Sequence, residues 1–336
     1  LSVATPALFG RRAVDLTLGP PPSRATDFST PAAGLAYFPP EPERFVGRVG
    51  AMSRASAAMA PESPKTGVLF HGMAGAGKTA CALELAYRYE AGGRFSAFVW
   101  HKAPDEGSDI ETALGNLALD MERQLPGLQM VHLVDQADEF AAWLPRLTEL
   151  LEQHSILITL DNLESLLTPA GGWRDERWGK LVDALLAHNG LSRLVLTSRR
   201  CPAGFQGRTQ RSLLHIEPIH ALSRDEAALL ARELPNLGRL LRGKAGIGLA
   251  EGRELVLRTL AVVQGHPKLI ELAEGQANDP AALADHLERA EKAWSGDEGV
   301  KTQDFASTET RRGASLQSRL STFFSEGESH VDAEEF

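Results

Sequence analysis

Cysteine is scarce in this 336-residue chain, which contains only Cys81 and Cys201. Two cysteines in a chain of this length are neither the dense disulfide framework of a small secreted domain nor a zinc ligand set. Long apolar runs are also missing, since no stretch reaches the roughly 18 residues that a membrane-spanning helix needs. Residues 1–10 lack the basic start and apolar core of a signal peptide. These absences predict a cytoplasmic protein with reduced thiols and no membrane partner.

An excess of positive charge is missing as well. The sequence has 35 lysines and arginines against 44 aspartates and glutamates, which gives a formal net charge of −9. A protein whose main surface neutralises a nucleic-acid backbone has the opposite balance. We therefore expect that nucleic acid is not the main partner, although a local basic patch stays open. With 43% hydrophobic and 24% charged residues, the composition is that of an ordinary globular protein.

Proline marks the first division of the chain. Prolines crowd residues 17–44, and at that density they interrupt both helices and central strands. We assign residues 1–43 to the tail of a preceding domain and a proline-rich linker, 44–217 to an α/β domain, 218–294 to a helical subdomain, and 295–336 to a flexible loop and the start of a truncated C-terminal region. Because the sequence begins at Leu1 and ends at Phe336 on an acidic segment, we expect a piece of a longer polypeptide.

Strand and helix patterns alternate through the α/β domain. Short apolar runs predict strands, and apolar residues at helical spacing predict the helices between them. The predicted strands cover 66–71, 95–101, 156–160, 193–197 and 213–216, and the predicted helices cover 79–91, 110–125, 140–151 and 181–188. This alternation predicts a doubly wound parallel sheet. Only helices are predicted after residue 218, the first opening with a capping box at Ser223 and Glu226 and the others covering 253–264, 267–274 and 280–294.

A glycine-rich loop lies between the first predicted strand and its helix. Gly72, Gly77, Lys78 and Thr79 satisfy the P-loop pattern G-x-x-x-x-G-K-[ST]. Glycines let backbone N–H groups turn inward around a phosphate, and the helix N-terminus adds its dipole. Lys78 supplies a positive charge to the β- and γ-phosphates, and the Thr79 hydroxyl can bind Mg²⁺. The predicted nucleotide-binding residues of this loop are Gly72, Met73, Ala74, Gly75, Ala76, Gly77, Lys78, Thr79 and Ala80.

Asp161 follows the apolar run at 156–160. A carboxylate at the end of a strand neighbouring the P-loop strand can hold Mg²⁺, so Asp161 joins Thr79 as a predicted metal-site residue and is the first predicted catalytic residue. The next residue is Asn162, an amide that cannot polarise an attacking water as a second acid would. Glu164 stays open between a catalytic base and a solvent-facing residue at a helix start. This arrangement predicts slow hydrolysis.

Arg199 follows the predicted strand at 193–197. A cation at the carboxyl end of a sheet can sense or neutralise the γ-phosphate, and Arg199 is therefore a third predicted catalytic residue. The alternative is a basic loop on the surface. Whether Arg199 would act within its own chain or across subunits stays open.

These motifs, in this order, resemble the STAND class of P-loop signal-transduction ATPases, which includes NB-ARC and NACHT domains. The resemblance covers residues 45–294. Phe45, Val46, Gly47 and Arg48 look like its F-x-G-R element, which lies against adenine. The segment from Gly265 through Pro267 looks like the G-x-P element of the helical lid, whose proline packs on the base. Asn162 departs from the family pattern, and so does the lack of a complete winged-helix domain after the lid.

The resemblance implies a switch that binds ATP or ADP with Mg²⁺. In such proteins the nucleotide domain couples a sensor to an effector, and ATP-bound units form homo-oligomers; both partner domains would lie outside this sequence. Residues 5–10 are similar to the closing segment of CHAT-type protease domains, which indicates a bacterial protein of this class with a role in defence. Two alternatives stay open: an AAA+-like ATPase that acts on nucleic acid, and a phosphoryl-transfer enzyme, for which no acceptor pocket is evident.

Overall fold

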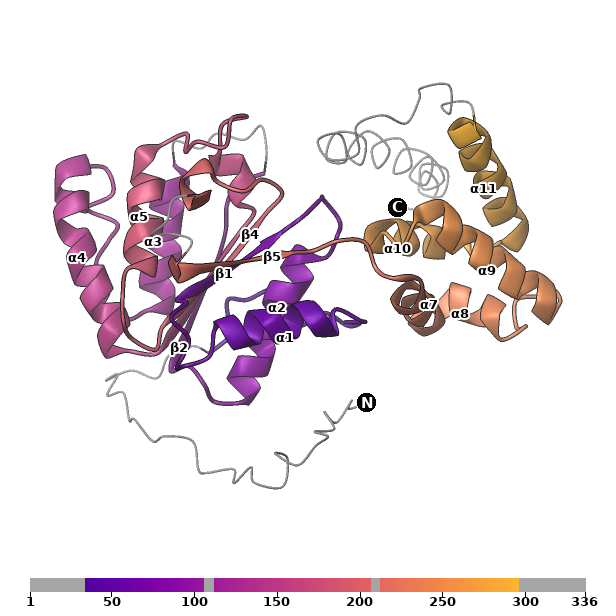
Figure 1. Ribbon diagram of the computed structural model, residues 1–336, viewed down its shortest axis with the longest axis horizontal. Coiled ribbons are helices and arrows are strands. Elements are labelled where there is room, and N and C mark those ends of the chain that lie inside the picture. The colour runs from indigo at the N-terminus through magenta and orange to yellow at the C-terminus, as the bar shows by residue number, and fades with distance from the viewer. Residues whose placement is uncertain (1–33, 106–111, 207–211, 296–336) are drawn as a thin grey trace, which may run out of the picture. The chain divides into compact units, whose positions relative to one another are not determined.

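A parallel five-stranded sheet forms the centre of the α/β domain (Figure 1). The computed structural model describes residues 34–105, 112–206 and 212–295. The strand order is β2-β3-β4-β1-β5, and the strands are β1 (Gly67–His71), β2 (Ala97–Lys102), β3 (Ile156–Asp161), β4 (Arg193–Ser198) and β5 (Leu214–Pro218). The predicted N-terminal tail up to residue 33 and the predicted C-terminal region from 296 lie outside the described residues.

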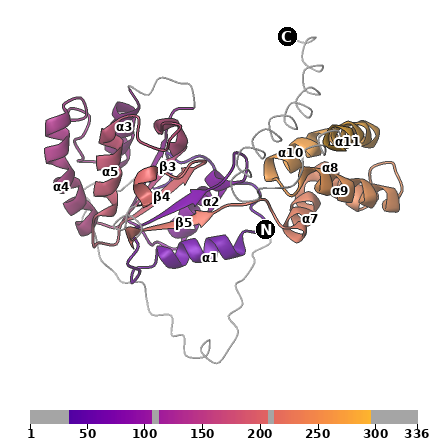
Figure 2. The same ribbon diagram turned by 45° about the horizontal axis from the view of Figure 1, so that its top comes forward.

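Helices cover both faces of this sheet (Figures 1 and 2). One face packs against α1 (Val49–Ala58) and α2 (Lys78–Ala91). The other packs against α3 (Ala113–Gln124) and α5 (Glu176–Leu186), and α4 (Ala137–Gln153) packs on α5. Because both faces are covered, the inner strands β3 and β4 are buried along their whole length, which is why each contains a run of three apolar residues, at 156–158 and 194–196. The predicted doubly wound α/β class is confirmed.

The order of the strands corrects one prediction. The strand that ends in Asp161 was expected beside the P-loop strand, but β4 lies between them and pairs with both β1 and β3. Local sequence patterns identify strands without fixing their order, which depends on how the connecting helices pack. The insertion of β4 brings Thr197, near its end, between the glycine loop and Asp161.

The helical subdomain follows β5 directly. It contains α7 (Arg224–Glu233), α8 (Pro235–Leu241), α9 (Leu249–Val263), α10 (Pro267–Gln276) and α11 (Pro280–Ser295). The capping box is confirmed, because Ser223 accepts from the Glu226 N–H and Glu226 accepts from the Ser223 N–H. Helix α8 was not predicted, since it is short, and α9 starts four residues earlier than expected. Within the described ranges, no helix has the length and apolar character to cross a membrane.

His188, which follows α5, makes the stability of the fold sensitive to acid. The side chain is buried and its Nδ1 accepts from the Gly190 N–H at 3.2 Å. Burial, reinforced by the positive charge of Arg193, lowers its pKa to about 4. Between pH 6.5 and 4 the unfolded chain therefore binds a proton that the folded chain does not, so stability falls as pH falls.

We expect this histidine to cost about 3 kcal/mol of folding free energy over that pH range. Urea unfolding of the wild type and of His188→Gln at pH 7 and pH 4.5 measures the difference between their pH dependences. The variant should lose less stability on acidification than the wild type. Identical losses in the two proteins would contradict the assignment.

Candidate nucleotide-binding site

The glycine loop runs from the end of β1 to the first turn of α2. Gly75 and Gly77 have φ values of 68° and 94°, a left-handed region in which glycine alone has no steric penalty. Gly72 is required for a different reason, because a Cβ there would lie 2.2 Å from the Ile219 carbonyl oxygen of the chain leaving β5. The three glycines thus permit a tight loop that opens onto the N-terminus of a 14-residue helix, the geometry that binds phosphate in P-loops.

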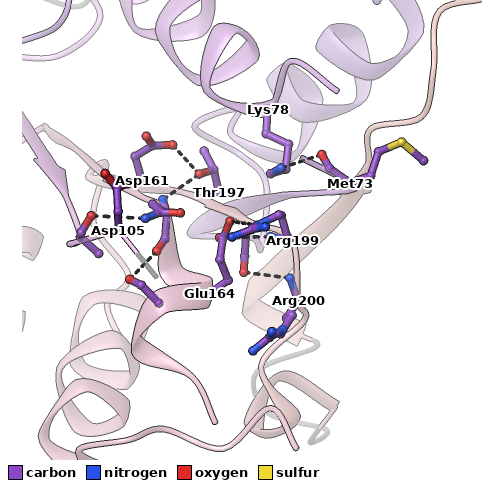
Figure 3. Close-up of polar contacts among 12 residues, drawn as sticks. Met73, Lys78, Asp105, Asp161, Glu164, Thr197, Arg199 and Arg200 are labelled. Atoms are coloured by element: carbon purple, nitrogen blue, oxygen red, sulfur yellow. Dashed lines mark hydrogen bonds and ion pairs between the residues drawn. The ribbon is translucent and has the colours of Figure 1, made fainter. Parts of the chain in front are cut away.

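Lys78 begins α2 and turns back over the loop (Figure 3). Its Nζ donates to the Met73 carbonyl at 2.9 Å, and the residue is only 8% exposed. Burial lowers the pKa of the ammonium, while the nearby carboxylates of Glu164 and Asp161 oppose that shift. The buried Lys78 ammonium has lost most of its hydration. It therefore favours an anionic ligand, because an ion pair would replace the lost contacts with water.

Asp161, the last residue of β3, faces the first turn of α2. Its Oδ1 accepts from the Thr79 hydroxyl at 2.8 Å and from the Thr197 hydroxyl. Burial raises the pKa of this carboxyl, and the two hydroxyl hydrogen bonds act in the opposite direction. The predicted metal residues Thr79 and Asp161 are therefore brought together, with a hydroxyl and a carboxylate oxygen of the kind that Mg²⁺ binds.

The fit to Mg²⁺ depends on a further ligand. Among the described residues no group of three or more His, Cys, Asp or Glu side chains could hold a metal ion. Magnesium in P-loop proteins takes few protein ligands and completes its shell with phosphate oxygens and water. Thr79 and Asp161 fit that role beside a phosphate loop, where they would hold a cation that neutralises phosphate charge.

Asn162 has a structural role at this edge of the sheet. Its backbone is left-handed, with φ 69°, and its N–H donates to the Thr197 hydroxyl at 3.0 Å. The side-chain Nδ2 donates to the carbonyl of Pro104 at 2.9 Å and contacts that of Ala103 at 3.4 Å. The amide therefore fixes the segment that leaves β2, and it has no group that could accept a proton from water.

Glu164 lies in the short 3-10 helix η2 (Leu163–Leu166) and is buried. The solvent-facing alternative is therefore wrong. The carboxylate accepts from Arg199 twice, from the backbone N–H at 3.1 Å and from Nε at 2.6 Å (Figure 3). These two hydrogen bonds anchor Arg199 at the edge of the sheet, with its side chain 37% exposed. Glu164 and Arg199, two of the three predicted catalytic residues, are therefore held to each other.

A cavity of about 270 Å³ opens beside the loop. The α/β domain and the helical subdomain both line it, and its lining residues include Phe45, Val46, Arg48, Gly75, Ala76, Gly77, Lys78, Thr79, Ala80, Leu222, Leu230, Pro267, Lys268 and Glu271. The apolar lining residues could pack against the face of a nucleotide base, and the loop residues could bind its phosphates. The predicted base-contacting residues Phe45, Val46, Arg48 and Pro267 thus meet in one place although up to 222 positions separate them in the chain.

Some predicted residues do not line this cavity. Gly47 has φ 72°, and a Cβ there would lie 2.5 Å from Oε1 of Glu226. Gly265 has φ 71°, and a Cβ there would lie 2.2 Å from the Leu222 carbonyl oxygen. Gly47 thus permits close packing of the helical subdomain, or lid, on the α/β domain, and Gly265 permits close packing within the lid. Gly72, Met73 and Ala74 also lie outside the lining.

Sequence reasoning missed the lid residues that line the cavity beyond Pro267. Leu222 and Leu230 belong to the apolar core of the helical subdomain, and their apolar character alone did not distinguish them from other core residues. Lys268 and Glu271 form an ion pair at 3.4 Å within α10, a common pattern on solvated helices. Glu226 was recognised only as a capping residue, yet its Oε1 also accepts from the Arg48 N–H at 2.7 Å.

No protein-family model matches this sequence, and neither does any curated protein. Solved structures do. A Walker-type ATPase of Pyrococcus abyssi is 11% identical, with 78% of this chain and 77% of that chain covered and a TM-score of 0.47. The Drosophila ORC bound to DNA is 17% identical, with 86% and 82% covered and a TM-score of 0.43. A chain of the Escherichia coli MS115-1 HORMA:CdnC:Trip13 complex is 14% identical, with 78% and 91% covered and a TM-score of 0.41.

The geometry of the α/β domain itself identifies its fold. A glycine loop joins β1 to α2, an acidic residue ends β3, and β4 lies between those two strands. Loop, lysine, hydroxyl and carboxylate converge at the carboxyl edge of one parallel sheet, where ligands bind in doubly wound folds. The chain from β1 to β5 therefore has the P-loop NTPase fold.

Proposed function

We propose that this chain binds ATP or ADP with Mg²⁺ and acts as a nucleotide-dependent signal-transduction switch. One observation carries the proposal: Pro267, Lys268 and Glu271 of the helical subdomain line the same cavity as the glycine loop. A nucleotide in that cavity touches both parts of the chain. Its phosphate count can then bias the position of the lid, which is how a γ-phosphate and its Mg²⁺ control two-state proteins.

The contacts around Asp161 support slow turnover. Asn162 replaces a second acid and is bonded to backbone carbonyls. Glu164, the nearest remaining carboxylate along the chain, is engaged by Arg199. A base held in an ion pair accepts a proton from water less readily. Slow hydrolysis is consistent with a switch, because the ATP-bound state must last long enough for the chain to oligomerise.

In the ATP state the chain forms homo-oligomers that gather effector domains, and a sensor domain controls entry into that state. The proposed effector and sensor domains are not part of this sequence. The proposed site of action is the cytoplasm. The acidic net charge of −9 supports protein partners over nucleic acid.

The proposal is tested by identifying the nucleotide that the purified protein retains. We expect ADP by chromatography of the denatured extract, and a larger assembly by light scattering when ADP is replaced by ATP with Mg²⁺. Absence of any nucleotide affinity would refute the binding site. A protein that stays monomeric and turns over ATP many times per second would refute the switch. DNA-stimulated hydrolysis with salt-sensitive DNA binding would instead favour the AAA+-like alternative.

Glu164 is the candidate base for ATP hydrolysis. If this carboxylate is the base, Glu164→Gln should lower the rate of ATP hydrolysis about 100-fold and leave the ATP dissociation constant nearly unchanged. Single-turnover hydrolysis and calorimetric binding measure the two quantities separately. Glu84→Gln, which removes a carboxylate from an ion pair within α2, is the matched control. An unchanged rate in Glu164→Gln would assign Glu164 to the anchoring of Arg199 alone.

A further inference from the structure

Three carbonyl groups of the glycine loop each accept a hydrogen bond from a basic side chain. Met73 accepts from Lys78 at 2.9 Å, Ala74 from His266 Nε2 at 2.9 Å, and Ala76 from Arg48 Nη2 at 2.7 Å. Lys78 belongs to the P-loop motif itself. The other two donors come from outside the loop, and His266 lies 192 positions away from Ala74 in the helical subdomain.

His266 has two distinct contacts, which assign its tautomer. It precedes α10 as the N-cap residue, and its Nδ1 accepts from the Leu269 N–H at 3.4 Å. The proton of the neutral ring is therefore assigned to Nε2, which donates it to the Ala74 carbonyl. The residue is 5% exposed. Burial lowers its pKa, the hydrogen bond to the Ala74 carbonyl opposes that shift, and the nearby charges of Arg48 and Lys78 lower the pKa as burial does. It is thus neutral at neutral pH.

A sharp turn between α9 and α10 positions the His266 ring. Gln264 and Gly265 have φ values of 49° and 71°, so α9 ends in two successive left-handed residues that turn the chain sharply. The Gly265 carbonyl then accepts from the Leu222 N–H at 2.8 Å. A non-glycine residue in the left-handed region is costly unless its surroundings hold it. The turn before His266 is therefore held in place by the rest of the lid.

Peptide planarity links these carbonyl contacts to the phosphate site. The C=O of Ala74 and the N–H of Gly75 belong to one planar trans peptide and point in opposite directions. A donor that holds the Ala74 oxygen therefore fixes the opposite direction of the Gly75 N–H. Arg48 does the same for the Gly77 N–H through Ala76. Gly75 and Gly77 both line the cavity, and as glycines they have more backbone freedom to restrain than other residue types.

We propose that His266 is a positioning residue of the phosphate site: by donating to the Ala74 carbonyl it orients the Gly75 N–H toward the bound phosphates, so that di- and triphosphate affinity depends on the lid. The proposal rests on the proposed nucleotide function. Binding is strengthened because the loop is ordered before the ligand arrives. Conversely, a lid that moves away withdraws His266 and loosens the loop.

Two substitutions separate this role from helix capping. Asparagine is a good N-cap and retains an acceptor near the Nδ1 position, but it is too short to reach Ala74. Glutamine places an amide nitrogen close to the Nε2 position and retains the donor. His266→Asn should therefore lose the loop contact and keep the cap, whereas His266→Gln should keep the loop contact.

The experiment measures ADP and adenosine binding by calorimetry on the nucleotide-stripped protein. We expect His266→Asn to weaken ADP binding about fivefold, the loss of one hydrogen bond, with adenosine unchanged and with His266→Gln within twofold of wild type for both. An unchanged ADP-to-adenosine ratio in His266→Asn, or equal losses in the two variants, would overturn the proposal. Wild-type protein that binds neither ligand would refute the proposed function instead.

A second measurement needs no nucleotide. In protein labelled with [¹⁵N]glycine, the Gly75 amide resonance should shift in His266→Asn and stay close to its wild-type position in His266→Gln. The Gly115 resonance provides an internal reference, because that glycine belongs to α3, outside the loop and the helical subdomain. A Gly75 resonance that is unchanged in His266→Asn would overturn the positioning role even if nucleotide binding is never observed.

Discussion

Lys78→Ala is expected to weaken ATP binding at least 100-fold and to abolish the retention of nucleotide during purification. The wild-type ammonium lies at the start of α2, is 8% exposed, and has the Met73 carbonyl as its hydrogen-bond partner at 2.9 Å. One neutral acceptor is a weak substitute for phosphate, and charge-assisted hydrogen bonds to two phosphates contribute about 1.5–3 kcal/mol each. Their sum corresponds to a factor of 100 or more in affinity.

The measurement is a calorimetric titration with ATP and Mg²⁺ on stripped protein. Lys292→Ala, which removes the same charge from an exposed ion pair on α11, is the control and should bind as the wild type does. Lys78→Arg should bind poorly as well, because the wider guanidinium does not fit a loop shaped around a single ammonium. Wild-type affinity in Lys78→Ala would place the phosphates elsewhere and remove the basis for the proposed function.

The sequence predicted the sheet and the phosphate loop because both depend on local patterns. A strand buried on both faces needs apolar side chains on both, and residues 156–158 of β3 and 194–196 of β4 supply them. The loop must contain glycine where φ is positive, as at Gly77. These requirements act over a few residues, so one sequence suffices to recognise them. Helix α1 was missed because its Ala- and Ser-rich sequence lacks a marked apolar stripe.

The contacts that refine the site are long-range, and local patterns cannot reveal them. The pairing of Glu164 with Arg199 spans 35 positions, and that of His266 with Ala74 spans 192. Each depends on the strand order and on how the lid packs, which only the folded chain determines. Glu226 makes both kinds of contact. Its local hydrogen bonds with Ser223 in the capping box were predicted, but the long-range hydrogen bond that it accepts from the Arg48 N–H was not.

Substitution of Asp161 by asparagine should produce two opposite effects. The amide side chain of Asp161→Asn would retain an oxygen that accepts from Thr79 and Thr197, as Asp161 Oδ1 does at present, but it would lack the charge that binds Mg²⁺. We therefore expect the Mg²⁺-dependent part of ATP affinity to disappear and hydrolysis to fall at least 100-fold. ADP binding in EDTA should change little, because no metal ion takes part in it.

The second effect is on stability without nucleotide. Burial raises the pKa of Asp161, so over the interval between its unfolded and folded pKa values the native state binds more protons, and stability falls as pH rises. At neutral pH the wild type therefore buries a charged carboxylate at a cost that the neutral amide avoids. Asp161→Asn should melt at the same temperature as the wild type or higher, as scanning fluorimetry can measure.

Glu288→Gln is the control for both effects, since it removes an exposed carboxylate paired with Lys292 on α11. It should leave melting temperature and Mg²⁺-dependent affinity unchanged. A gain of stability in Asp161→Asn together with a loss of Mg²⁺ response would mean that this buried charge is retained for the cation and not for the fold. Retention of the Mg²⁺ response would show that Thr79 and the phosphates hold the ion without it, and the metal assignment of Asp161 would then be wrong.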